Sequence, residues 1–272
     1  MSQETAELVI EAGRAERHYW RDLWRYRELL YFLAWRDVKV RYKQTVIGVA
    51  WVVLRPLLTM AVLTLVFDRI AGLGQDSAVP YALMVFAGLL PWQFFATAFA
   101  DSGNSLVGNA QMISKVYFPR IMVPVSSVLA GLVDFAVTLL LLIPLMAWYG
   151  HWPGWQVLLL PIFLTFGILV TLSAGIGLAA LNVNYRDVRY VIPFVVQFGL
   201  YVSPVGFSAS EVPEAWRWLY DLNPMVGVIE GFRWSLLGGD YAASPAALLN
   251  SLVLGSVMLD RKSTRLNSSH YS

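Results

Sequence analysis

The sequence predicts an all-α integral membrane protein with six transmembrane helices. The chain is 57% hydrophobic and only 14% charged, whereas soluble domains are about 45–50% apolar and about 25% charged. It also contains six apolar runs of about the length needed to cross a bilayer core of roughly 30 Å, which takes about 20 helical residues. Within a transmembrane domain of residues 46–259, these runs are 48–67, 79–100, 121–149, 155–181, 190–207 and 242–259.

The distribution of lysine and arginine predicts which loops face the cytoplasm. Fourteen of them lie before or at the start of the first run, after the second run or after the fourth. Only Arg69, Arg217 and Arg233 lie in the opposite loops. Because cytoplasmic loops carry the excess of positive residues, we expect residues 1–45 to be cytoplasmic and the stretch before the sixth run to lie outside.

The N-terminal 45 residues contain an aromatic and basic segment, HYWRDLWRYRELLYFLAWR, at 18–36. Trp20 and Trp24 recur at helical spacing, and Arg21 and Arg25 fall on another face. This pattern is typical of an amphipathic helix that lies in the membrane interface. The alternative is a basic anchor that only fixes the topology.

The last 13 residues, 260–272, differ from everything before them. Their sequence, DRKSTRLNSSHYS, is polar and without pattern, and it resembles a cloning or sequencing adapter. We therefore expect this tail to be non-native and the natural end of the sixth span to be missing.

Nucleotide and metal sites are not expected in this chain. A phosphate-binding loop needs a lysine after a glycine, and none of the four lysines follows one. The chain has no cysteine, and its three histidines, His18, His151 and His270, are far apart. We therefore expect no cofactor to bind here.

Ion-coupled transport and catalysis are also poorly supported. Ion-coupled carriers place several ionisable groups in the membrane, but only Asp134 lies clearly inside a predicted span. We expect it to be structural, paired or protonated between helices. No span contains a histidine or two neighbouring acids, so acid–base catalysis has no visible machinery.

The loop between the second and third runs, DSGNSLVGNAQMISKVYFPR, is a candidate docking element. Residues 104–115 predict a short helix, with Asn109 capping its second half and Pro119 ending it. A short polar helix on a cytoplasmic loop suits contact with a soluble partner. The alternative is a plain connector.

The stretch at 219–240, LYDLNPMVGVIEGFRWSLLGGD, is too apolar for a free loop. Asn223-Pro224 interrupts it, since a residue before proline avoids the helical region. We expect two short helices that re-enter the membrane from outside. Glu230 and Arg233, about one turn apart, are expected to pair. They either form an outer gate with Asn223 and Pro224 or make a surface ion pair worth about 0–1 kcal/mol.

Four segments together resemble the permease subunit of ABC type-2 polysaccharide exporters. These are RDVKVRYKQTVIGVAWVVLRPLLTMAVLTLVF, VYFPRIMVP, NVNYRDVRYVIPFVVQFGLYVSPV and LNPMVGVIEGFRWSLLG, and the resemblance extends over about residues 20–259. Proteins of that family export lipid-linked O-antigen, capsular polysaccharide or teichoic acid. The chain departs from the family at its C-terminus, where the sixth helix should continue.

The resemblance implies a homodimer in the bacterial cytoplasmic (inner) membrane, served by two separate ATPase subunits that carry ATP and magnesium. It implies no catalytic role and no nucleic-acid partner. It assigns an interface helix to about 19–35, a coupling helix to about 104–115 and a pair of outer helices to 211–237. The implied ATPase-coupling residues are Asn104, Asn109, Gln111, Met112 and Lys115.

Aromatic side chains facing a channel between two copies are expected to stack on sugar rings. The candidates, at the end of the second run and on the fifth, are Trp92, Phe94, Phe95, Phe99, Tyr201 and Phe207. The alternative is that they face lipid at the membrane boundary. Two other functions stay open: export of a drug or small lipid by the same fold, and a membrane-embedded enzyme or glycan assembly factor.

Overall fold

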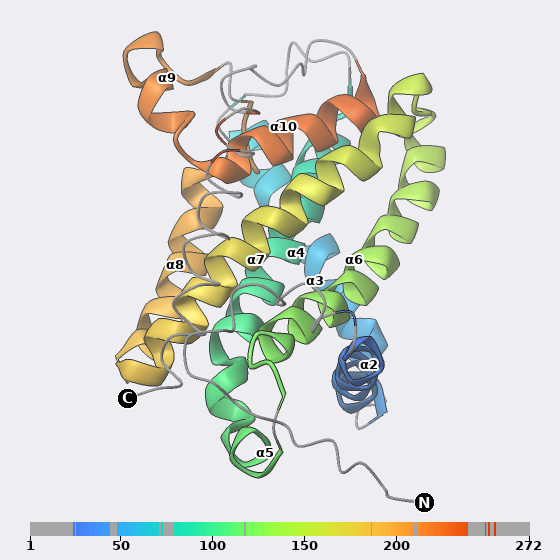
Figure 1. The fold of residues 1–272 in the computed structure, drawn as a ribbon. Coiled ribbons are helices and arrows are strands. Elements are labelled where there is room, and N and C mark those ends of the chain that lie inside the picture. The colour runs from blue at the N-terminus through green and yellow to red at the C-terminus, as the bar shows by residue number, and fades with distance from the viewer. Residues whose placement is uncertain are drawn as a thin grey trace, which may run out of the picture.

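The computed structural model describes residues 24, 26–43, 48–70, 72, 79–116, 118–185, 187–208, 211–238, 248, 250 and 253. Over these residues the chain is helical and contains no strand (Figure 1), which confirms the all-α class. Three candidate residues of the interface helix, Trp20, Arg21 and Arg25, lie outside the described residues, as does the tail 260–272. Of the sixth run, only residues 248, 250 and 253 are described, and each is helical.

Four helical segments are long and apolar enough to cross a membrane: Ala50–Ile70, Tyr81–Gly108, Met122–Tyr149 and Trp155–Asn184. The chain therefore has the character of a multi-pass membrane protein. The segments are formed by α3 (Gly48–Leu63) with the π-helix η2 (Thr64–Ile70), by α4 (Tyr81–Gly108), by α6 (Met122–Tyr149), and by the 3-10 turn η3 (Trp155–Leu159) with α7 (Leu160–Asn184).

The fifth run forms a shorter helix than the sequence predicts. Helix α8 spans Val188–Val202, 15 residues, or about 22 Å at 1.5 Å per residue. It ends because Pro204 disfavours the helical conformation at Ser203, which is extended with φ −90° and ψ 152°. By its length alone, α8 does not cross a core of about 30 Å.

Helix α4 is the centre of the fold. In its most apolar window, 83% of residues are buried, and it packs against α3, α6, α7, α8 and α10. Small residues allow the close approach: a Cβ added at Gly131 of α6 would lie 3.2 Å from Ala98, and one at Gly175 of α7 would lie 2.6 Å from the Ser102 hydroxyl. This is the packing mode by which membrane helices associate without a hydrophobic driving force.

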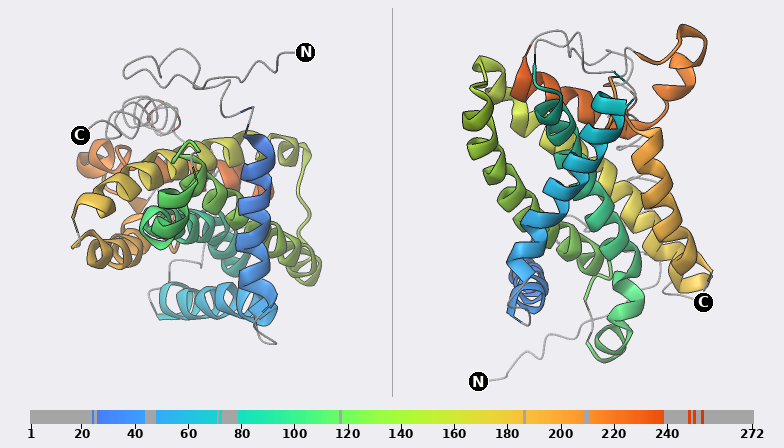
Figure 2. Two further views of the ribbon diagram at one scale, coloured as in Figure 1. Left: turned by 60° about the horizontal axis from the view of Figure 1, so that its bottom comes forward. Right: turned by 180° about the vertical axis from the view of Figure 1, so that it is seen from behind.

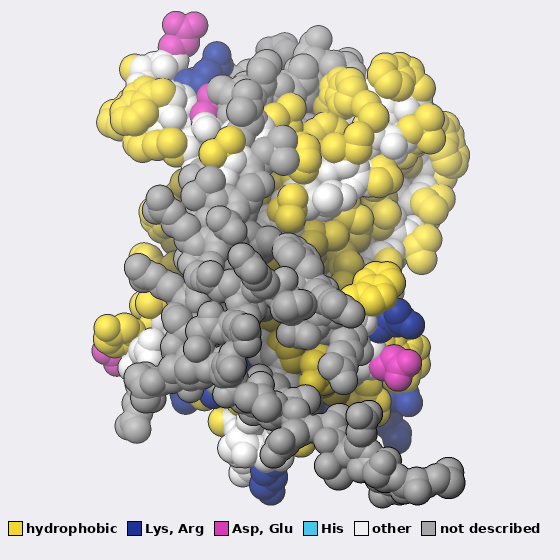
Figure 3. Space-filling model, viewed as in Figure 1, with side chains coloured by type: hydrophobic (Ala, Val, Ile, Leu, Met, Phe, Trp, Pro, Cys, Tyr) yellow, Lys and Arg dark blue, Asp and Glu magenta, His cyan; other side chains and the backbone are white. Residues whose placement is uncertain are grey.

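The remaining helices lie at opposite ends of the bundle. Helices α2 (Arg27–Lys43) and α5 (Ala110–Lys115) lie at one end, with α9 (Glu214–Tyr220) and α10 (Pro224–Leu237) at the other (Figures 1 and 2). The basic segments and the outer stretch are thus separated as the sequence predicts. On the face shown in Figure 3, the described charged side chains lie near these ends and hydrophobic ones lie between them.

Candidate functional site

Helix α2 is docked onto the bundle by a small apolar cluster of its own. Leu33 is 1% exposed and packs with Leu106 of α4, Met122 of α6 and Ala179 of α7. Met112 and Ile113 of α5 lie against the same cluster. Helices α2 and α5 therefore pack against the same apolar cluster at this end of the molecule.

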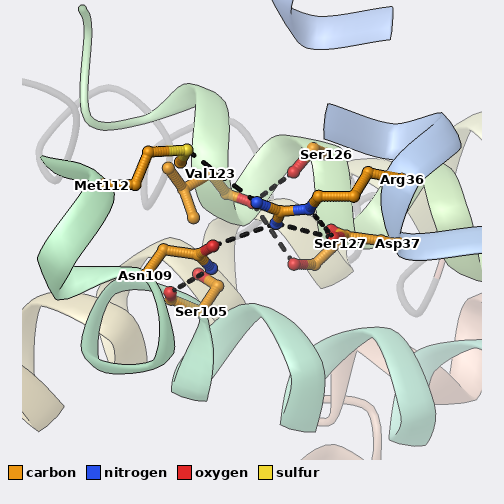
Figure 4. Close-up of polar contacts among 8 residues, drawn as sticks. All are labelled: Arg36, Asp37, Ser105, Asn109, Met112, Val123, Ser126 and Ser127. Carbon is orange, nitrogen blue, oxygen red and sulfur yellow. Dashed lines mark hydrogen bonds and ion pairs between the residues drawn. The ribbon is translucent and has the colours of Figure 1, made fainter. Parts of the chain in front are cut away.

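Arg36 joins α2 to the segment between α4 and α5 (Figure 4). Its Nη2 donates a hydrogen bond to Oδ1 of Asn109 at 2.9 Å, and its Nη1 lies 3.8 Å from Sδ of Met112. Asp37 holds the guanidinium from the other side, with Nη2–Oδ1 at 2.7 Å. The sequence did not single out Arg36, because its partner Asn109 is 73 positions away.

The predicted helix over 104–115 is wrong as a single element. Residues 104–108 complete α4, the chain breaks at Asn109 with φ −107° and ψ 18°, and α5 begins at Ala110. The Asn109 side chain does not cap α5; it accepts from Arg36 and donates to the Ser105 carbonyl at 2.9 Å. Asn109 is therefore the joint between two helices.

The other coupling candidates divide into two groups. Asn104 faces α7, where its Oδ1 accepts from Nδ2 of Asn182 at 3.1 Å. Gln111 and Lys115 are exposed on α5, and Met112 is half-buried against Arg36. Asn104 is exposed as well, but its side chain is engaged by Asn182, so Gln111 and Lys115 are the candidates on α5 that offer exposed side chains to a partner.

Exposed aromatic residues lie beside cations on α2 and just before its first residue. Trp24 is 71% and Trp35 is 47% exposed. The Arg27 guanidinium lies 5.3 Å from the Trp24 ring, and the Lys39 ammonium lies 5.5 Å from the Trp35 ring. Amphipathic side chains of this kind suit a membrane interface. Helix α2 extends to Lys43, eight positions beyond the expected end at 35.

Near its C-terminus α2 is tied to two spans by a charge cluster. Arg41 donates to Asp101 of α4 at 2.5 Å and to Asp134 of α6, and the Tyr42 hydroxyl also donates to Asp134. Asp134 is therefore paired, one of the forms expected from its position. Burial lowers the pKa of Arg41, but the two carboxylates outweigh it and raise the pKa overall. Burial also raises the pKa of Tyr42 above its ordinary value.

A cavity of about 630 Å³ adjoins this cluster. It lies among α3, α4, α6 and α8, and the view from behind shows α3 and α8 on either side of the lower half of α4 (Figure 2). Its polar and charged lining residues are Arg41, Arg55, Thr59, Gln93, Thr97, Asp101, Asp134, Thr138 and Gln197. Its aromatic lining residues are Trp51, Trp92, Phe94 and Phe135.

The six aromatic candidates do not share one surface. Trp92 and Phe94 line the cavity. Phe95 and Phe99 stack on each other inside the core, 5.3 Å apart. Tyr201 is 62% exposed on α8, and Phe207 lies beside Tyr220, 6.2 Å away. Trp51, which the sequence analysis did not consider, joins the cavity, and its four-residue spacing from Arg55 is the signal that places both on one helix face.

At the opposite end, Arg233 of α10 is buried among backbone carbonyls. It is 1% exposed, and it donates to the carbonyls of Met84 at 3.2 Å and of Val205 and Phe207 at 2.8 Å each. The interpretation as a surface ion pair is therefore wrong for Arg233. A Cβ added at Gly88 would lie 2.9 Å from its Nη2, so glycine there makes room for the guanidinium. Glu230 is half-buried one turn earlier, and its pairing with Arg233 stays a prediction.

The break predicted at Asn223-Pro224 separates α9 from α10. The Asn223 Oδ1 accepts from the Met225 N–H at 3.0 Å, and Pro224 occupies the first turn. This is the usual N-cap arrangement, in which the side chain satisfies one of the unpaired N–H groups of a helix start. The Asn223 Nδ2 also donates to the Ser203 hydroxyl at 3.0 Å, which fixes α10 to the end of α8.

Comparison with known proteins gives this arrangement a family. The sequence profile of the ABC-2 type transporter family matches residues 28–237, which include α2, α5, the cavity and α10. The chain is 31% identical to the O-antigen export system permease protein RfbA of Myxococcus xanthus, covering 78% of this chain and 82% of that one. It is 29% identical to the protein of the same name from Klebsiella pneumoniae (78% and 81%) and 24% identical to the polysialic acid transport protein KpsM of Escherichia coli (75% and 79%). The chain therefore belongs to the ABC-2 type transporter family.

Proposed function

We propose that this chain is the permease subunit of an ATP-driven exporter that moves a lipid-linked polysaccharide across a bacterial inner membrane. The observation that carries the proposal is the similarity to O-antigen export permeases over 78% of the chain. Another relative is named as a transport protein for polysialic acid, which is also a polysaccharide. The substrate class therefore follows the names of these relatives.

In this proposal the chain is not an enzyme, and ATP and magnesium bind to a separate ATPase subunit, present in two copies. The family supports such a partner, and no phosphate-binding loop occurs in the sequence. The exposed side chains of Gln111 and Lys115 on α5 are the docking surface. Charge reversal at Lys115 is expected to weaken ATPase binding while the permease remains inserted.

Motion of the ATPase is proposed to reach the spans through α2. Docking displaces α5, and the Arg36–Asn109 hydrogen bond carries that displacement to α2. The Arg41 cluster then joins α2 to α4 and α6, both of which line the cavity. Every link in this path is a contact between side chains far apart in the sequence.

Two copies of the chain are proposed to form the channel, each with six spans: the four long segments, α8 together with the non-helical residues 203–208 that follow it, and residues 242–259. The N-terminus is cytoplasmic, and α9 and α10 re-enter the membrane at the outer mouth. Trp92 and Phe94 face the passing glycan and stack on sugar rings. Two of the other four candidates, Phe95 and Phe99, support this wall from inside the core.

The test is deletion of the gene followed by complementation. We expect the deletion strain to lose a surface glycan and to accumulate its lipid-linked form inside, and we expect the intact chain to restore export. Normal surface glycan combined with altered drug susceptibility would instead favour export of a small molecule. Loss of the lipid-linked glycan itself would indicate a role in synthesis.

A further inference from the structure

Arg55 is a charged residue in an unusual place. It lies on α3 within Ala50–Ile70, one of the four segments long and apolar enough to span the membrane, and it is exposed. Among the described residues, no ion pair or hydrogen bond engages its guanidinium. A charge inside a span is costly, and such residues mark ligand or ion pathways.

The side chain of Arg55 borders the cavity rather than the apolar core. Trp51 and Thr59, four positions before and after it, line the cavity from the same face of α3. Gln93 and Thr97 line it from α4. The cavity volume of about 630 Å³ lies within the range of roughly 300–1,000 Å³ that small-molecule sites occupy.

The two arginines that line this cavity differ in their ion pairs. Arg41 forms ion pairs with both Asp101 and Asp134, and Asp134 also accepts a hydrogen bond from the Tyr42 hydroxyl. Arg55 has no such partner in the part of the chain that the structure describes. Among the described residues, the cavity therefore presents one guanidinium that no carboxylate contacts, surrounded by amide and hydroxyl groups and by two indole rings.

We infer that Arg55 binds the phosphate or diphosphate group that links a glycan to its lipid carrier. The planar guanidinium fork matches phosphate oxygens with two parallel hydrogen bonds, and Gln93 and Thr97 supply further donors. Trp51 and Trp92 flank the position of the first sugar. This inference rests on the proposed function, and it names the chemical group by which that substrate is recognised.

Binding is tested with the purified full-length permease by native mass spectrometry. The probes are geranylgeranyl diphosphate, geranylgeraniol, which has the same chain without the anion, and inorganic diphosphate, which has the anion without the chain. We expect tight binding of the first and weak binding of the other two. Equal binding of inorganic diphosphate would make a free phosphate compound the ligand and would contradict the lipid-linked assignment.

Variants identify the residue responsible. Arg55→Gln is expected to weaken binding of geranylgeranyl diphosphate by about tenfold to a hundredfold, the usual effect of losing a hydrogen bond to a charged group. Arg55→Lys keeps the charge but loses the fork, so its affinity is expected to be intermediate. Arg69→Gln is the matched control: Arg69 is an exposed arginine at the other end of the same segment, outside the cavity lining.

Unchanged binding by Arg55→Gln, or equal binding of the diphosphate and the alcohol, would overturn the inference. If Arg55→Gln misfolds, it will aggregate on size-exclusion chromatography. Binding of geranylgeranyl diphosphate by Arg55→Lys, compared with the unchanged protein, then tests the inference. A different result would contradict the proposed function: a deletion strain that keeps its surface glycan. In a strain where the intact chain restores export, Arg55→Gln should leave ATPase activity in place and let lipid-linked glycan accumulate inside.

Discussion

Two arginines at opposite ends of the molecule, the half-buried Arg41 and the buried Arg233, are held in different ways. Arg41 is held by the side chains of Asp101 and Asp134, whereas Arg233 is held by the main-chain carbonyls of Met84, Val205 and Phe207. Carboxylates sit on side chains that can rotate, and carbonyls are fixed by the backbone that carries them. The difference suggests that the Arg41 end is a joint that can open and that the Arg233 end is fixed.

The largest effect is expected from Arg233→Met. Removal of the guanidinium leaves three buried carbonyls without this donor, and each unsatisfied buried group costs about 1–3 kcal/mol. We expect the free energy of unfolding to fall by about 3 kcal/mol or more, seen as a lower melting temperature in detergent and a lower membrane yield. Arg217→Met, at an exposed position on α9, is the control. Equal stability of the two variants would show that Arg233 is not a fixed point.

Gly88→Ala tests the same end without removing a hydrogen-bonding group. The new methyl group would lie 2.9 Å from Nη2 of Arg233, so the guanidinium must shift away from its carbonyls. Overpacking of this kind usually costs about 1–3 kcal/mol. At Gly108, also on α4, an added Cβ meets nothing within 4 Å. Thermal unfolding should therefore separate Gly88→Ala from Gly108→Ala, and identical curves would contradict the assigned role of Gly88.

At the other end, Arg41→Gln is expected to cost about 1–3 kcal/mol, since it leaves two carboxylates without their cation. The triple variant Arg41→Gln, Asp101→Asn, Asp134→Asn removes all three charges and should recover part of that stability. Both variants are expected to keep ATPase activity in the assembled complex and to lose export. Full export by either variant would mean that the cluster does not transmit motion.

The smallest effect is expected at the joint between α2 and α5. A double-mutant cycle with Arg36→Gln and Asn109→Ala measures their interaction, and we expect a coupling energy of about 1 kcal/mol, because both groups are partly exposed. Additive effects on stability would indicate that the 2.9 Å hydrogen bond contributes nothing. Reduced export in either single variant, at normal stability, would support the path through α2.

The positions of most helices followed from apolar runs, and the differences have local causes. Helix α4 continues to Gly108 through a polar stretch because Ser102 and Ser105 are buried, 0% and 6% exposed, against neighbouring helices. The sequence pattern instead ended the span at residue 100 and predicted a separate short helix at 104–115. Helix α8 ends early because Ser203 precedes a proline, a signal that was present in the sequence but weaker than the apolar run around it.

The candidate site was less predictable, because its contacts join distant segments. Arg41 and Asp134 are 93 positions apart, and Arg233 and Met84 are 149 apart. The sequence predicted Asp134 to be structural, paired or protonated between helices, and it did not name a partner, because several arginines were available. Likewise, a run of aromatic residues on α4 does not reveal that Trp92, Phe94, Phe95 and Phe99 all pack in the core and that two of them, Trp92 and Phe94, also line the cavity.

Helix α4 carries contacts of both arginines, and this gives it the geometry of a lever. Met84 touches Arg233 and Asp101 touches Arg41. At 1.5 Å per residue, these two positions are about 25 Å apart along the helix axis. If α4 tilts by about 5° around the Arg233 end, the Asp101 end moves by roughly 2 Å, which is enough to break a hydrogen bond of ordinary length. A small rotation is thus amplified into the making or breaking of one ion pair.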